Sequence, residues 1–158
     1  MPSPMTIKIE CEPYLIQFYT KIFGPQPIFF PKGHILAFTL RHLLDRPPRT
    51  PVPEPDYESC IEIQIPYNDE KNVLYNFHLS KQSKRIMSFR LEREFKLTFR
   101  EDINASRLAG LKRNDAIHLF IDKYDLGEDI FDRLIKDYYR NYHLRRYYGS
   151  KKSRKKAK

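Results

Sequence analysis

The chain has 158 residues, of which 41% are hydrophobic and 31% charged, a composition typical of a folded globular protein with its own core. Its apolar runs are too short to cross a membrane, and its first residues lack the apolar stretch of a secretory signal, so we expect a cytoplasmic protein. Two cysteines, Cys11 and Cys60, are too few for a disulfide framework or a four-ligand metal site. Membrane proteins, secreted miniproteins and zinc fingers are thereby excluded.

Charge is unevenly distributed along the sequence. The chain carries 29 basic and 20 acidic residues, for a formal net charge of +9. Nine of the basic residues, and no acidic residue, lie in segment 140–158, so the remainder of the chain is neutral. An excess that is confined to one end predicts a polyanionic partner, and nucleic acid is the first candidate.

Residues 1–45 predict an N-terminal helical lobe. It begins with a β-capable stretch at 6–10, and a helix with apolar residues at three- and four-residue spacing runs from 13 until Gly24-Pro25 ends it. A second helix is expected over about 32–44. We expect its inward face to consist mostly of Ile35, Phe38, Leu40, Leu43 and Leu44.

Residues 46–56 contain five prolines in eleven positions, which excludes a helix. We interpret this segment as a linker between the lobe and an α-rich body at 57–148. The alternative is a ligand for a proline-recognising domain of the SH3 or WW type. Residues 149–158 are too highly charged to fold alone and predict a disordered basic tail.

The body begins with the clearest strand of the sequence, at 59–66, whose candidate partners are 6–10 and 28–30. A long helix follows, in which apolar residues recur every four positions: Met87, Leu91, Phe95, Phe99 and Ile103. Its basic residues are interleaved with acidic ones. This pattern favours a solvated face with ion pairs over a phosphate-binding face for Arg90, Arg93, Lys96 and Arg100.

Two further helices are predicted at the end of the body. Asn114 is a candidate N-cap for a helix over 115–124, which Asp125-Leu126-Gly127 ends. The next helix runs from about 128 to about 148. Its apolar stripe consists of Ile130, Phe131, Leu134, Ile135, Tyr138 and Tyr142. The fold class we expect is α+β and mainly α: a helical domain with a small two- or three-stranded sheet and a C-terminal helical hairpin.

No motif of an enzyme is present in the sequence. The five histidines are scattered without metal-binding spacing, and the five glycines form no phosphate-binding loop. The tyrosines between 138 and 148 lack the paired histidines that a metal-assisted tyrosine nucleophile would need. We therefore expect a non-enzymatic protein with no catalytic residue, metal or cofactor; an active site assembled from residues distant in sequence stays open.

The C-terminal segment mixes tyrosine, arginine and lysine in a way that suits nucleic acid. Aromatic rings stack on bases, guanidinium groups pair with phosphates, and lysines release counterions. The predicted nucleic-acid-binding residues are Arg133, Lys136, Arg140, Arg145, Arg146, Tyr147, Tyr148, Lys151, Lys152, Arg154, Lys155 and Lys156.

Residues 116–136, AIHLFIDKYDLGEDIFDRLIK, resemble a helix-turn-helix. The buried positions of that motif correspond to Phe120, Tyr124, Leu126, Phe131 and Leu134. The stretch KYDLGEDIFDRLIK is similar to the C-terminal motif of Mor-type phage transcription activators and other mobile-element regulators, which implies DNA binding in a phage or mobile-element setting. Base contacts usually come from the start of the second helix, where this chain has Glu128, Asp129 and Asp132.

We thus expect a nucleic-acid-binding protein, with DNA favoured over RNA, in which the basic C-terminal arm supplies the affinity and the hairpin orients it. The alternative is a structural or interaction protein, such as a virion, ribosome-associated or conjugation component, whose tail contacts nucleic acid non-specifically. A homodimer or a protein partner stays open, as does sequence specificity.

Overall fold

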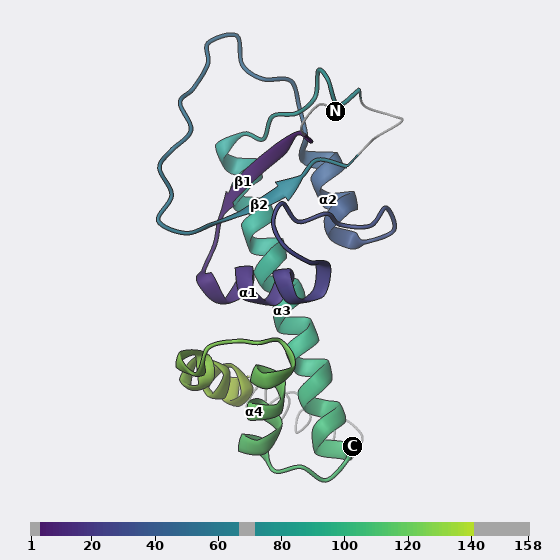
Figure 1. The fold of residues 1–158 in the computed structure, drawn as a ribbon, viewed down its shortest axis with the longest axis vertical. Coiled ribbons are helices and arrows are strands. Elements are labelled where there is room, and N and C mark those ends of the chain that lie inside the picture. Colours follow the sequence, from purple (N-terminus) through teal and green to yellow (C-terminus); the bar gives the residue numbers. More distant parts are fainter. Residues whose placement is uncertain (1–3, 67–71, 141–158) are drawn as a thin grey trace, which may run out of the picture. The chain divides into compact units, whose positions relative to one another are not determined.

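The computed structural model describes residues 4–66 and 72–140, and the chain divides into two compact units between Thr98 and Phe99. This boundary lies within the long helix α3 (Lys81–Leu108), which contributes its first part to unit 1 and its last part to unit 2 (Figure 1). The fold is α+β and mainly helical, as the sequence predicts. The proline-rich segment 46–56 does not separate two lobes, because the strands on either side of it pair with each other inside unit 1.

Unit 1 contains an antiparallel pair of strands, β1 (Thr6–Glu10) and β2 (Cys60–Gln64). The register places Ile7 opposite Ile63 and Ile9 opposite Ile61, and all four side chains are buried. Alternation with period two puts them on one face of the sheet, where cross-strand apolar pairs stabilise the pairing. The predicted strand at 59–66 and its partner at 6–10 are confirmed.

The second predicted partner, 28–30, contributes one residue. Ile28 forms a parallel bridge to Ile63. Its N–H donates to the carbonyl of Glu62 and its carbonyl accepts from the N–H of Gln64, both at 2.8 Å. The sheet therefore has two strands and a single-residue extension.

Helix α1 (Pro13–Phe23) packs its aromatic face against the first part of α3. The ring of Phe95 lies 4.9 Å from that of Tyr14 and 5.0 Å from that of Phe18, measured between centroids. The buried hydroxyl of Tyr19 donates to the carbonyl of Leu91 at 2.6 Å. Burial raises the pKa of this hydroxyl, so it stays protonated as a donor.

Helix α2 (Ile35–Leu43) is shorter than predicted, and its buried face is different. The side chain of His34 caps its first turn by accepting from the N–H of Leu36 at 3.2 Å. Phe38, which we expected to face inward, is 52% exposed, and Ile35 is exposed as well. Leu40 and, just after the helix, Leu44 are buried as expected, and Leu36 and Ala37 take the remaining buried positions.

Unit 2 consists of the last part of α3, helix α4 (Arg113–Lys123), a 3₁₀ turn η1 (Glu128–Ile130) and helical residues 131–140. Its core joins one buried stripe from each helix, and the rings of Phe99 and Phe120 meet edge to face at 5.1 Å. Helix α4 begins two residues earlier than predicted. Its N-cap is Lys112, without a side-chain cap bond, rather than Asn114.

Candidate nucleic-acid interface

Three of the predicted contact residues lie on one exposed face of helical segment 131–140. Arg133, Lys136 and Arg140 follow three- and four-residue spacing, which places them on one side of a helix. All three are exposed, whereas Leu134 between them is completely buried. The structure thus brings these three cations together on the side of the segment that faces solvent.

Carboxylates accompany this basic face. Asp137, whose side chain is largely buried, lies 3.9 Å from the exposed guanidinium of Arg140 at i,i+3 spacing. Asp129 and Asp132, at the start of the second helix of the hairpin, are exposed. The charge of this face is therefore mixed.

A cation–aromatic pair adjoins the same segment. The guanidinium of Arg113, at the start of α4, lies over the ring of Tyr139 at 4.8 Å from its centroid and donates a hydrogen bond to the tyrosine hydroxyl. Tyr139 is 41% exposed. The guanidinium covers one face of this ring; its remaining N–H groups and the exposed part of the ring are of the kinds that contact single-stranded phosphates and bases. Because these residues are 26 positions apart, sequence spacing carries no signal for the pair.

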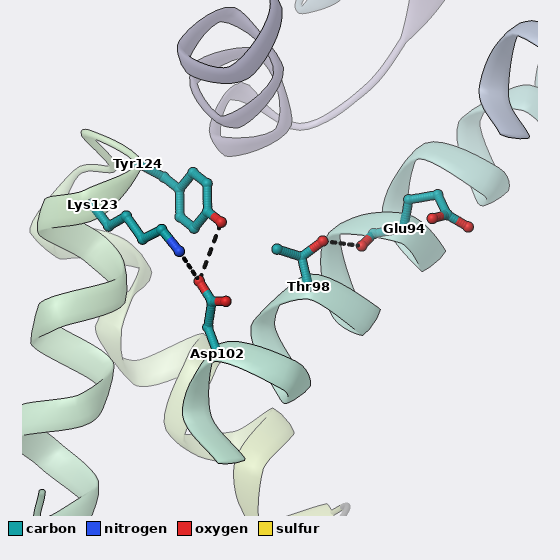
Figure 2. A network of polar contacts seen from close by, with 5 residues as sticks. All are labelled: Glu94, Thr98, Asp102, Lys123 and Tyr124. Atoms are coloured by element: carbon teal, nitrogen blue, oxygen red, sulfur yellow. Dashed lines mark hydrogen bonds and ion pairs between the residues drawn. The ribbon is translucent and has the colours of Figure 1, made fainter. Parts of the chain in front are cut away.

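A polar network fixes the other end of α4 to the last part of α3 (Figure 2). The carboxylate of Asp102 accepts from the ammonium of Lys123 at 2.9 Å and from the hydroxyl of Tyr124 at 3.2 Å. The hydrogen bond to Asp102 raises the pKa of Lys123, and burial, with the charge of Asp102, raises the pKa of Tyr124. Both donors therefore stay protonated, and α4 is held in register on α3.

The turn after α4 sets the direction of the basic segment. Asp125 adopts a left-handed conformation with φ of 51°, while the N–H of Leu126 donates to the carbonyl of Ile121 at 3.0 Å. This is the hydrogen-bond pattern of a Schellman turn, in which glycine usually takes the left-handed position. The chain contains the glycine version at the end of α3, where Gly110 has φ of 95° and Leu111 N–H donates back to Ser106.

In addition to the Arg113–Tyr139 pair, side-chain contacts of His118 join the two helices of the hairpin beyond its core. The imidazole of His118 stacks on the ring of Phe131 at 4.4 Å and lies 3.6 Å from a carboxylate oxygen of Glu128. Phe131 is half-buried by this contact, and the other four expected buried positions of the hairpin are buried. The hairpin thus has a defined core.

The remaining predicted contact residues lie outside the described residues. They are Arg145, Arg146, Tyr147, Tyr148, Lys151, Lys152, Arg154, Lys155 and Lys156, together with Tyr142 of the predicted apolar stripe.

The basic residues of α3 differ from the expected pattern of a face laced with ion pairs. Within the described parts of the chain, Lys96 pairs with Glu92 at 3.2 Å, but no ion pair forms at Arg90, Arg93 or Arg100. The expectation was wrong for these arginines, because an ion pair at the surface gains little in water and helical spacing alone does not secure it.

Unit 1 also has a shallow surface hollow of about 430 Å³, lined by Arg46, Pro47, Leu74, Tyr75 and Phe77. The lining contains one cation and otherwise apolar or aromatic groups, with no carboxylate, imidazole or thiol. It therefore offers contact surface rather than a nucleophile or a general base.

Comparison of the chain with protein-family models, with curated proteins and with solved structures gives no match. Among residues 4–66 and 72–140, no helix combines the length and apolar character that a bilayer span requires.

Proposed function

We propose that this is a non-enzymatic nucleic-acid-binding protein of the cytoplasm, whose basic C-terminal arm provides most of the affinity. The observation that carries the proposal is the distribution of charge: nine basic residues and no acid in 140–158, against a neutral remainder. Each phosphate that such an arm neutralises releases counterions, which gives affinity without a shaped pocket. DNA is the favoured ligand, on the resemblance of the hairpin to phage and mobile-element regulators.

The hairpin supports this proposal as the element that orients the arm. Its exposed cations, Arg133, Lys136 and Arg140, lie on the helical segment that leads into the arm, and the Arg113–Tyr139 pair adds a stacking surface beside them. A helix-turn-helix regulator would read bases from the start of its second helix. Because Glu128, Asp129 and Asp132 are exposed there, we propose binding with little sequence preference, which agrees equally with a structural component of a nucleoprotein particle.

The test is fluorescence anisotropy with labelled duplex DNA, single-stranded DNA and RNA across a salt series. The full chain is compared with a variant in which Lys151, Lys152, Arg154, Lys155 and Lys156 are all replaced by Gln. If all five residues contact phosphates, the negative slope of log affinity against log salt concentration for duplex DNA becomes shallower by about 4 to 5 in the Gln variant.

A matched control separates local contact from net charge. Five exposed basic residues of unit 1 are replaced by Gln, for the same change in charge: Lys8, Lys21, Lys32, Arg46 and Arg49. We expect this variant to change the duplex slope by less than about 1. Equal behaviour of the two variants would contradict the assignment to the arm, and a clear preference for one duplex sequence at raised salt would favour a specific regulator.

A further inference from the structure

The outer side of the first part of α3 carries exposed apolar groups among basic ones. Met87, Leu91 and Phe95 bury the inner side of this helix in unit 1. On the opposite side, Phe89 is 64% exposed and Ile86 is 40% exposed. An exposed phenylalanine at the centre of a solvent-facing helix surface is not explained by the packing of unit 1.

Basic residues predominate around this phenylalanine, and the nearest acid that follows it, Glu92, pairs with Lys96 at 3.2 Å. From Lys81 to Leu91 the helix has four basic residues and no acidic one. Lys84 is engaged on the side of the proline-rich segment, where it contacts the carboxylate of Glu54 at 3.4 Å and the hydroxyl of Tyr57 at 3.2 Å. In contrast, Arg85, Arg90 and Arg93 form no ion pair with any described residue.

This pattern is poorly suited to docking another helix. A docked helix needs apolar anchors that continue at i, i+3, i+4 and i+7. After Ile86 and Phe89, the positions that would continue the anchors, 90 and 93, are arginines. A second copy of the same face would bring arginines against arginines.

An aromatic ring bordered by arginines suits a strand of bases and phosphates. From Arg85 to Arg93 the helix rises about 12 Å, enough to contact a few nucleotides. Unpaired bases can stack on an exposed ring while guanidinium groups contact the adjoining phosphates, whereas bases inside a duplex present no free face. We propose that this face, defined by Arg85, Ile86, Phe89, Arg90 and Arg93, is a second nucleic-acid site that binds single strands, independent of the C-terminal arm.

The sharpest test uses the fact that the chain has no tryptophan. In the full-length variant Phe89→Trp, the new indole is the chain's sole tryptophan, and stacking of a base on it quenches its fluorescence. We expect saturable quenching by oligothymidine and little quenching by duplex DNA. The matched control is Phe38→Trp, at a phenylalanine of unit 1 that is 52% exposed but lies on α2; we expect no quenching there.

Affinity measurements complete the test. Phe89→Ala should weaken oligothymidine binding by about five- to one-hundred-fold, the range found when one stacking residue is removed, and Phe38→Ala should not. Arg90→Gln with Arg93→Gln should lower the salt slope for oligothymidine by about 1.4, and Arg46→Gln with Arg49→Gln should leave it unchanged. Phe89 is exposed, so its replacement does not open a core cavity.

The outcomes separate the two sites. In one outcome, anisotropy shows that oligothymidine binds, yet without quenching Phe89→Trp and with equal affinity for Phe89→Ala and the unsubstituted chain. That result would overturn the α3 site and leave the arm proposal standing. If Gln substitution of the arm abolishes duplex binding, and oligothymidine still quenches Phe89→Trp in that background, both proposals are supported. If Phe89→Ala weakens binding of polyglutamate instead of oligothymidine, the face belongs to an acidic protein partner and the proposal is overturned.

Discussion

Two helices of this protein carry basic faces, and the acidic residues near them distinguish the two. On helical segment 131–140, Arg133, Lys136 and Arg140 share their side of the hairpin with Asp129, Asp132 and Asp137. On the first part of α3, the stretch from Lys81 to Leu91 has no acid, Glu92 after it pairs with Lys96, and an exposed phenylalanine lies among the cations. On segment 131–140 a carboxylate lies close to one of the cations, whereas the arginines beside Phe89 form no ion pair with a described residue. The α3 face is therefore the better candidate for a ligand that both stacks and carries negative charge.

Removal of a core side chain of unit 2 should destabilise the basic face of segment 131–140 and leave the face of α3 intact. Leu134 is fully buried, and Leu134→Ala should lower the free energy of unfolding by about 2–5 kcal/mol through lost burial and a cavity. Urea denaturation followed by circular dichroism measures this loss. Quenching of Phe89→Trp by oligothymidine should persist in the same background, because that face belongs to unit 1. An unchanged urea midpoint would show that segment 131–140 does not pack on the core of unit 2.

The carboxylates beside Arg133 and Lys136 should weaken phosphate binding by segment 131–140. Asp129→Asn with Asp132→Asn keeps side-chain shape and removes two charges that repel phosphate. We expect duplex affinity at low salt to rise several-fold, corresponding to about 1 kcal/mol, with the gain lost at high salt. Anisotropy measures it, with Glu12→Gln and Glu58→Gln, exposed acids of unit 1, as the charge-matched control. An equal rise in the control would mean that net charge alone is responsible.

The smallest change in stability is expected at the turn between α4 and segment 131–140. Asp125 holds a left-handed conformation that costs an L-residue energy and glycine little, so Asp125→Gly should raise the free energy of unfolding by up to about 1 kcal/mol. Asp122→Gly, inside α4, should lower it by a similar amount, because glycine weakens a helix interior. Thermal unfolding distinguishes the two variants; a loss of stability in both would contradict the left-handed assignment.

Much of the fold was predictable from periodicity and from turn residues. The alternation at 59–66 and the four-residue repeat from Met87 to Ile103 each correspond to an observed element with the expected buried face. The inner face of α2 was not predictable, because residues 35–40 are apolar except for Thr39 and give no period from which to choose. The start of α4 was missed since its N-cap, Lys112, carries no recognisable capping side chain.

The candidate sites divide in the same way. The spacing of Arg133, Lys136 and Arg140 is sufficient by itself to place them on one face of a helix. The Arg113–Tyr139 contact depends on tertiary packing between helices and leaves no trace in local sequence. In α3, the sequence spacing places Ile86 beside the buried stripe. Only the exposed fraction of Ile86 shows that it lies with Phe89 on the outer side of the helix.

The pairing of β1 with β2 has a consequence for the order in which the chain folds. These strands join across the whole of α1, α2 and the proline-rich segment, a loop whose closure costs entropy before any contact repays it. The contacts of unit 2, such as Asp102 with Lys123, span about twenty residues and can form early. A nascent or refolding chain therefore holds β1 unpaired until β2 arrives. A fusion partner that hindered residues 6–10 would leave Ile61 and Ile63 on a bare strand edge, open to aggregation.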